Sequence, residues 1–316
     1  MQASRRSHLL AVLSLALIAA IWGGGFPATK YALQAGLSVG ALLTLRFAIG
    51  TAGLGLCIAL LKVPIRRQAV LDGCWLGLVL ATLFWLQTDG LRFTTTAKSG
   101  FITGLYVIFT PMVALLAGDR LRPAHGLGAG VALVGLLMLV REPGAAWGGW
   151  NRGDSETLVA AVLCGVHIVL TAHFSRRSSG WVLALTQVAV TGAASLVLAL
   201  TLPAPFGFEG TAQALARPGV WIALGFMGLL ATTLAFYVQS TMQARLGATE
   251  SAILFSTEPL WTALLAISGW IPGIREHLSR TQLAGGLLIL AATLLAEAGP
   301  RLLRRLQATE AEDAIG

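Results

Sequence analysis

The sequence predicts an all-α membrane protein in which ten transmembrane helices form two inverted five-helix repeats. The 316 residues are 56% hydrophobic and only 11% charged, whereas a soluble domain carries about 25% charged residues. The mean hydropathy is +0.76. Long apolar segments recur along the whole chain, and short motifs of its first half reappear in its second half.

The apolar segments have the length of membrane-spanning helices. A helix needs about 20 mainly apolar residues to cross the hydrocarbon core of a bilayer. The runs are continuous and do not alternate, which disfavours the strands of a membrane barrel. Ten segments qualify and leave no room for a separate soluble domain: 8–33, 37–61, 72–92, 97–117, 124–141, 155–174, 180–202, 218–242, 247–269 and 280–298.

The basic residues indicate how the chain is oriented. The net charge is +8, and 13 of the 22 Lys and Arg residues fall on the side of the N-terminus, with eight on the other side. Loops rich in Lys and Arg stay in the cytoplasm. We therefore expect a multi-pass protein of the bacterial inner membrane with two cytoplasmic tails, 1–7 and 299–316. This charge distribution indicates a lipid bilayer as partner and not a nucleic acid.

The second half of the chain repeats the first. FWLQT at 84–88 matches FYVQS at 236–240, an offset of 236 − 84 = 152 residues. A stretch rich in glycine and charge separates five segments from five, so we predict repeats over 8–140 and 155–298 joined by a loop at 141–154. Because five is odd, the second repeat enters the membrane from the opposite side. Inverted repeats of this kind enclose a solute site near the midplane of the bilayer.

Several stretches resemble the EamA-type members of the drug/metabolite transporter superfamily. They are IWGGGFPATKYAL, LTLRF, LRFTTTAKSGFITGLYVIFTPMVALLAGDRL, RGDSETLVAAVLCGVHIVL and LGATESAILFSTEPLWTALL. The resemblance covers 8–298 in the family's order. It implies a ten-helix inverted-repeat carrier of small metabolites, often an exporter of amino acids or related compounds. Cys164 and His167 stand where the family commonly shows Trp and Tyr.

Glu258 and Pro259 interrupt the ninth apolar segment. A carboxylate at the centre of a spanning helix costs about 2.5–3.5 kcal/mol on insertion scales, and a proline leaves a backbone carbonyl without its partner. Glu258 is therefore a candidate pathway residue that binds a cation, a proton or a solute. The alternative is a structural ion pair with an intramembrane cation such as Arg46. Pro111 in FTPMV matches Pro259, so we expect a kink at both prolines.

Gln87 and Gln239 occupy matching positions beside the aromatic residues Trp85 and Tyr237. Neutral amides bind and release a polar solute without the tight hold of a full charge. We expect these four residues to line the two ends of a substrate pathway. The alternative for the amides is hydrogen bonding between helices, worth about 0.6 kcal/mol each.

Three further residues are unusual within apolar segments. Trp22 precedes three glycines that weaken the first helix, and it forms a cavity wall or packs. Arg46 is a structural intramembrane charge that we expect to pair with Glu258 or Asp89, and substrate binding is the alternative. His167 is a candidate proton acceptor in the pathway, since histidine titrates near neutral pH; hydrogen-bonded packing is the alternative.

The remaining patterns predict a secondary transporter without cofactor or metal. The chain has no P-loop for nucleotide phosphates and no HExxH pair, and its three cysteines lack metal-binding spacing. The expected small-molecule substrate moves by alternating access, and an intramembrane enzyme or a passive channel is the alternative. Glycines in the fifth and tenth segments provide faces for packing within a monomer or for a homodimer seam.

Overall fold

The computed structural model describes residues 2–116, 123–139 and 149–292, and the regular structure in these ranges is entirely helical. Within these ranges, eight helical segments are long and apolar enough to cross a membrane. Two shorter apolar helices, Gly130–Leu139 and Arg280–Ala292, lie in the predicted fifth and tenth segments. The all-α membrane class is confirmed, with helices at all ten predicted places and a spanning length in eight of them.

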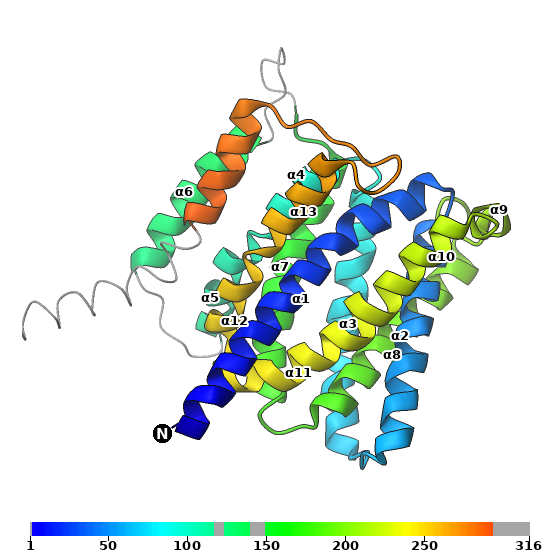
Figure 1. Cartoon of the computed structure of the whole chain (residues 1–316), viewed down its shortest axis with the longest axis vertical. Coiled ribbons are helices and arrows are strands. Elements are labelled where there is room, and N and C mark those ends of the chain that lie inside the picture. Colours follow the sequence, from blue (N-terminus) through cyan, green and yellow to red (C-terminus); the bar gives the residue numbers. More distant parts are fainter. Residues whose placement is uncertain (1, 117–122, 140–148, 293–316) are drawn as a thin grey trace, which may run out of the picture.

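Most of the segments are single helices (Figure 1). They are α1 (Gln2–Gln34), α2 (Val39–Leu61), α3 (Arg67–Gly90), α6 (Pro123–Leu139), α7 (Arg152–Phe174) and α8 (Gly180–Thr201), with the short α9 (Thr211–Leu215) after them. α1 extends into the predicted tail 1–7, and the predicted tail 299–316 lies outside the described residues. α7 begins inside the predicted loop 141–154, because Asn151 and Asp154 form a reciprocal capping box there.

Two segments are interrupted in the middle. The fourth consists of α4 (Thr96–Thr103) and α5 (Tyr106–Leu116), and the ninth consists of α12 (Ala248–Phe255) and α13 (Glu258–Ser268). Pro259 lies in the first turn of α13, where a missing N–H costs no hydrogen bond.

The first-half interruption is not at the proline that we expected to kink the helix. Pro111 lies inside the continuous helix α5, and the chain leaves the α4 geometry at Gly104 and Leu105 instead. A Cβ atom on Gly104 would come within 2.6 Å of Pro259 Cγ. Glycine thus lets the two interrupted segments approach each other at their breaks.

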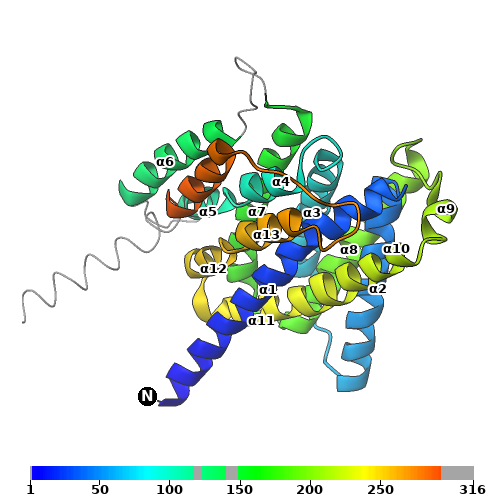
Figure 2. The same ribbon diagram turned by 45° about the horizontal axis from the view of Figure 1, so that its top comes forward.

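The eighth segment contains a π-helix. α10 (Pro218–Gly225), η1 (Phe226–Leu234) and α11 (Ala235–Leu246) follow one another without a gap, and η1 has π-helical hydrogen bonding. π-Helical turns are rare and are frequent at functional sites. This segment faces α1 and α2 in the bundle (Figure 2).

The helices of the main bundle approach each other closely. α3 packs against α7 and α8, while the η1–α11 segment packs against α1, α2 and α8. A Cβ atom on Gly77 would lie 2.6 Å from Val190 Cβ, which brings α3 and α8 together. Small residues of this kind allow the van der Waals contact that holds helices together in lipid.

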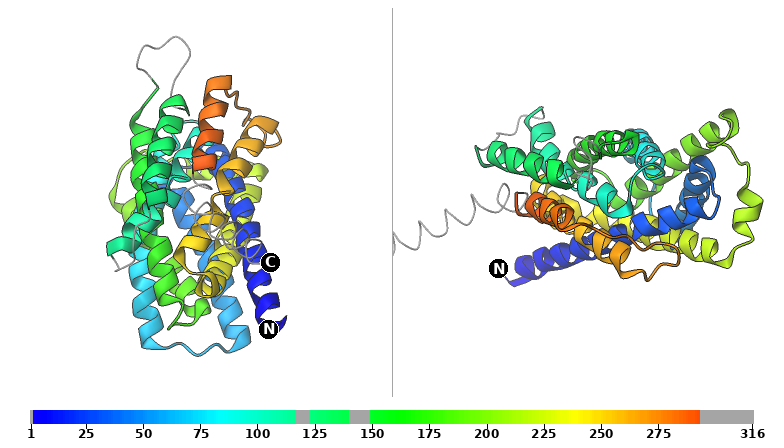
Figure 3. Two further views of the ribbon diagram at one scale, coloured as in Figure 1. Left: turned by 90° about the vertical axis from the view of Figure 1, so that its left-hand side faces the viewer. Right: turned by 90° about the horizontal axis from the view of Figure 1, so that it is seen from above.

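α6 and helix 280–292 form a pair at the margin of the bundle, side by side in every view (Figure 3). A Cβ atom on Gly135 would come within 2.7 Å of the carbonyl oxygen of Gly285. These two glycines, from the fifth and tenth segments, therefore pack against each other within one chain.

Candidate substrate cavity

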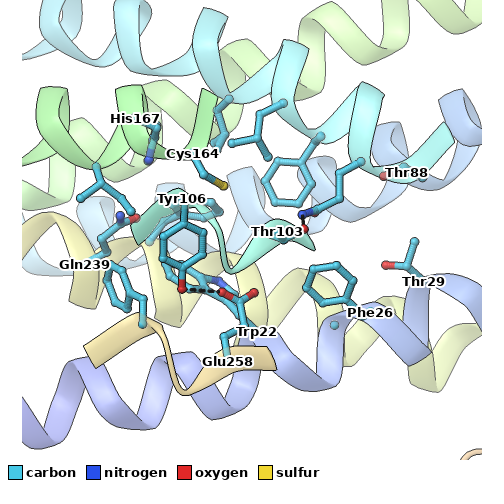
Figure 4. Close-up of a pocket in the computed structure, with 18 of the residues that line it drawn as sticks. Trp22, Phe26, Thr29, Thr88, Thr103, Tyr106, Cys164, His167, Gln239 and Glu258 are labelled. Carbon is cyan, nitrogen blue, oxygen red and sulfur yellow. Dashed lines mark hydrogen bonds between the residues drawn. The ribbon is translucent and has the colours of Figure 1, made fainter. Parts of the chain in front are cut away.

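A cavity lies at the centre of the main bundle (Figure 4). Six residues that we singled out from the sequence line it, each from a different helix: Trp22, Arg46, Gln87, His167, Gln239 and Glu258. Apolar and aromatic side chains make up most of the remaining lining, which is typical of small-molecule sites. Helix packing thus gathers polar residues that are far apart in sequence.

Two residues that we expected in the pathway lie outside the cavity lining. Trp85 Nε1 donates a hydrogen bond to Ser195 Oγ at 3.3 Å. The ring of Tyr237 stacks on Trp181 with centroids 3.7 Å apart. Two residues along an α-helix are separated by roughly 200°, so each aromatic ring points away from the glutamine two positions later. Trp85 and Tyr237 therefore lie outside the central cavity, and their place at the ends of a pathway stays a prediction.

Glu258 is buried at the first position of α13, with 8% of its surface exposed. Tyr106 Oη donates a hydrogen bond to its Oε2 at 3.3 Å (Figure 4). The N-terminal end of a helix stabilises a carboxylate through its dipole. In the described part of the chain no cation lies within salt-bridge distance of Glu258, so the expected pair with Arg46 does not form.

Arg46 has no carboxylate partner among the described residues either. Its Nε donates to Thr232 Oγ1 at 3.0 Å, and its guanidinium carbon lies 4.4 Å from the ring centroid of Phe84 and 5.5 Å from that of Phe47. Aromatic faces attract a desolvated guanidinium through the quadrupole of the ring. Cation–π contacts and one hydroxyl thus replace the ion pair that we expected.

The other expected partner, Asp89, is already engaged at the end of α3. Its two carboxylate oxygens accept from Arg92 and from Arg152, both at 2.6 Å. Arg152 also pairs with Glu156 at 2.6 Å. Asp89 therefore belongs to a network at one end of the bundle and not to the cavity.

An aromatic wall forms one side of the cavity. We use this name for Trp22, Phe84, Phe236 and Phe255, which all line it. Ring centroids are 5.2 Å apart between Trp22 and Phe255, 5.7 Å between Trp22 and Phe236, and 6.4 Å between Phe84 and Phe236. Trp22 Nε1 donates to the carbonyl oxygen of Ala231 in η1 at 3.0 Å.

His167 is the first member of a hydrogen-bonded chain. Its Nε2 lies 2.7 Å from Gln187 Oε1, and Gln187 Nε2 donates to Ser240 Oγ at 3.1 Å. Because Gln187 Oε1 can only accept, Nε2 of His167 carries the hydrogen in this arrangement. The imidazole lines the cavity and is hydrogen-bonded to its neighbour, and its role as a proton acceptor stays a prediction.

The two repeat-related glutamines differ in their contacts. Gln87 Nε2 donates to Thr103 Oγ1 at 3.2 Å, which joins α3 to the end of α4. Gln239 is buried, and its Oε1 has no hydrogen-bond partner among the described residues. A buried amide oxygen without a partner is costly, and Gln239 faces the cavity, where a solute can satisfy it.

Two ion pairs each join two neighbouring helices, and they lie at opposite ends of the bundle (Figure 1). Lys98 Nζ lies 2.7 Å from Asp154 Oδ2 and joins the starts of α4 and α7, with side chains 6% and 0% exposed. His8 Nε2 lies 3.4 Å from Glu250 Oε1 and joins α1 to α12, with side chains 53% and 27% exposed. The contact of α4 with α7 is thus held by a buried pair and the contact of α1 with α12 by a more exposed one.

The carboxylate of Asp72 forms a further ion pair at the N-terminal end of the bundle. Arg177, in the turn between α7 and α8, donates to both oxygens of Asp72 at 3.0 and 2.6 Å. These hydrogen bonds raise the pKa of the Arg177 guanidinium. Ser178 Oγ donates to the same carboxylate at 2.7 Å.

The sequence analysis missed several residues of the site. Tyr106 could have been found, because it lies 152 residues before Glu258, the offset of the FWLQT and FYVQS motifs. The phenylalanines of the aromatic wall carry no such signal, since apolar residues fill every segment. Thr232 could not have been singled out, because its role depends on the π-helical turn in which it lies.

A family model for EamA-like transporters matches residues 9–141 and 151–297. The chain belongs to the EamA-like transporter family. It is therefore a membrane transporter and not an enzyme.

Two relatives of this transporter are named only as uncharacterised transporters. The one from Archaeoglobus fulgidus is 30% identical over 289 residues, which are 91% of this chain and 86% of the relative. YdeK from Bacillus subtilis is 30% identical over 220 residues, 66% of this chain and 68% of the relative.

A third relative has a named substrate, and a solved structure shares the fold. The aromatic amino acid exporter YddG of Ancylobacter novellus is 28% identical over 217 residues, 66% of this chain and 70% of the relative. A crystal structure matches with a TM-score of 0.65 and 20% identity over 93% of this chain and 99% of the other. This last match concerns the fold alone.

Proposed function

We propose that this transporter is a secondary carrier that exports amino acids or related small metabolites by alternating access around the central cavity. The observation that carries the proposal is the cavity lining. Arg46 from the first predicted repeat and Glu258 from the second lie in it, neither has an ion-pair partner among the described residues, and an aromatic wall completes it. Such a lining suits a solute with an apolar body and charged groups.

The packing supports an inverted-repeat mechanism. α1 contacts η1–α11 and α12–α13, the eighth and ninth segments, while α7 contacts α3 and α4–α5, the third and fourth. The first helix of each predicted repeat thus packs on the same two elements of the other repeat. α2 and α8, the second helix of each repeat, pack on each other. Packing of the first helix of each repeat against the other repeat is expected for two bundles that rock around a shared site.

The helix interruptions support the same interpretation. α4 ends at Thr103 and α12 at Phe255, and 255 − 103 = 152. α5 begins at Tyr106 and α13 at Glu258, again 152 residues apart. Interrupted helices that meet at corresponding positions are typical of binding sites in secondary transporters.

The two ion pairs at the ends of the bundle are suitable gates for alternating access. Lys98 and Glu250 are 152 residues apart, since 250 − 98 = 152. Each binds the first helix of the opposite repeat at one end of the bundle. In the proposed cycle, one pair opens as the other closes.

The chemistry of the cavity supports amino acids as the substrate class. The aromatic wall offers apolar contact to a side chain, and Arg46 and Glu258 offer opposite charges to a carboxylate and an ammonium group. The relative from Ancylobacter novellus is named as an exporter of aromatic amino acids. We propose a location in the bacterial inner membrane with both termini in the cytoplasm.

The test is flux through purified protein in liposomes. Vesicles are loaded with labelled L-phenylalanine, L-leucine or L-glutamate, and efflux is followed with and without unlabelled solute outside. We expect saturable efflux of an apolar amino acid that external solute accelerates, because a carrier exchanges faster than it returns empty. Efflux of all three solutes that is no faster than from loaded vesicles without the protein would refute the proposed substrate class. Unitary conductance would indicate a channel.

Orientation is tested separately in cells. A reporter active only in the cytoplasm is fused to each end of the full chain. Activity at both ends is the expected result, and activity at one end alone would contradict two inverted five-helix repeats.

A further inference from the structure

Arg46 carries donor groups that no part of the described chain uses. It lines the cavity and is 4% exposed. Its Nε is the one donor atom with a hydrogen-bond partner among the described residues, Thr232 Oγ1. A guanidinium has five N–H donors in a planar fork, so both terminal nitrogens are left without a partner among the described residues.

The surroundings of Arg46 hold the guanidinium in place without neutralising it. Phe84 and Phe47 lie under it, with ring centroids 4.4 and 5.5 Å from its central carbon. Thr232 belongs to the π-helix η1, which also accepts the Trp22 indole N–H at Ala231. The π-helical turn therefore positions two cavity residues at once.

A structural role alone does not account for this arrangement. Intramembrane charges are almost always paired with an opposite charge or with backbone carbonyls. The two carboxylates that we expected from the sequence to pair with Arg46 both have other partners. Glu258 accepts from Tyr106, and Asp89 binds Arg92 and Arg152. The opposite charge for Arg46 must then come from outside the described chain.

We propose that Arg46 is the anion subsite of the cavity and binds the carboxylate of the transported solute through its two terminal nitrogens. This inference rests on the proposed carrier function and assigns one substrate group to one residue. A carboxylate matches the fork of a guanidinium with two parallel hydrogen bonds. Arg46 is the single Lys or Arg in the lining formed by the described residues, and Glu258 lies in the same cavity. A monoanion therefore suits the site better than a doubly charged phosphate.

The experiment compares solutes that differ in one group. Wild-type protein in liposomes transports labelled L-phenylalanine, and unlabelled competitors are compared by how strongly they inhibit this flux. The competitors are L-phenylalanine, its carboxamide, its phosphonate analogue and phenethylamine. Loss of a charge-assisted bidentate contact reduces affinity by about tenfold to a hundredfold, so we expect L-phenylalanine to compete at least about tenfold better than the amide. Equal competition by acid and amide would overturn the proposal, and preference for the phosphonate would overturn the choice of carboxylate.

The variants locate the effect at Arg46. In Arg46→Gln we expect the preference for acid over amide to fall to about twofold or less, while flux of the amide persists. Thr232→Val removes the Nε acceptor at nearly constant shape and should reduce the preference partly. Arg217→Gln, an exposed arginine at the start of α10, is the matched control and should keep it. An unchanged preference in correctly folded Arg46→Gln would refute the subsite.

Two further results keep the inferences distinct. If Arg46→Gln does not elute as a folded monodisperse species, Arg46→Lys takes its place, because it keeps the charge and loses the fork. Its preference should then be intermediate, and a wild-type value would count against bidentate binding. Absence of flux of L-phenylalanine, L-leucine and L-glutamate in wild-type protein would refute the proposed function itself, whereas flux without carboxylate preference would refute only the role of Arg46.

Discussion

Tyr106 and Glu258 begin the second halves of the two interrupted segments, and their side chains meet: Tyr106 Oη donates to Glu258 Oε2 at 3.3 Å. Both residues are buried and line the cavity. The contact joins α5 to α13 at the place where each helix starts. A change in the relative position of the two segments must therefore alter the environment of Glu258.

Glu258→Gln should reduce transport by more than about tenfold, because an ammonium group loses a charge-assisted hydrogen bond to the carboxylate. The substitution keeps the size of the side chain, so the protein should fold. Initial efflux rates from liposomes measure the effect. Glu209→Gln is the matched control, since Glu209 is exposed in the segment between α8 and α9, outside the cavity lining and the two end pairs. Equal rates for the two variants would remove Glu258 from the pathway.

Tyr106→Phe should weaken transport less than Glu258→Gln does. It removes one hydrogen bond to a buried acceptor, an effect of about 1–3 kcal/mol, and leaves the ring in the core. Thermal unfolding in detergent and efflux kinetics are measured together. Tyr237→Phe serves as control, because the ring of Tyr237 stacks on Trp181 outside the cavity and its stack survives the loss of the hydroxyl. Impaired transport in this control variant would place Tyr237 in the pathway.

Gly23→Ala should destabilise the fold by about 1–3 kcal/mol through overpacking. A Cβ atom at this position would lie 2.6 Å from Trp261 Cβ and 2.9 Å from the carbonyl oxygen of Glu258. The backbone of α1 or α13 must then move. Gly25→Ala is the control within the same glycine run, because a Cβ atom there meets nothing within 4 Å. Unfolding temperatures of the two variants should differ clearly, and similar values would disprove the close α1–α13 contact.

The ion pairs at the two ends should differ in strength. Lys98→Met leaves Asp154 buried without its charge partner, which typically costs about 3–5 kcal/mol. Glu250→Ala breaks an exposed pair, which is worth about 0–1 kcal/mol. Denaturation in mixed detergent micelles compares the two variants. A larger loss for Glu250→Ala would show that the end at α4 and α7 is not the more firmly closed one.

Several features of the fold were predictable from single segments. Whether a segment is long and apolar enough to span a bilayer depends on its own residues, and helices lie at all ten predicted places. The presence of Glu258 and Arg46 within apolar segments was sufficient to mark them as candidates. The close contact of Gly104 with Pro259 at the break was not predictable in the same way, because it joins segments that are far apart in the sequence.

The partners of the polar residues were not predictable, because they depend on how each helix is rotated about its axis. Trp85 and Tyr237 are sequence neighbours of Gln87 and Gln239, and the sequence predicts all four along one pathway. The helical rotation of roughly 100° per residue turns Trp85 and Tyr237 to other faces, where they contact Ser195 and Trp181.

The sequence by itself determined a helical membrane protein and the family to which it belongs, because insertion into a bilayer is a property of each segment and its order. Only the tertiary structure decided that Arg46 and Glu258 lie in one cavity without pairing. Long-range contacts between helices are weak and numerous in lipid, and their sum sets which faces meet. That sum cannot be read from any one segment.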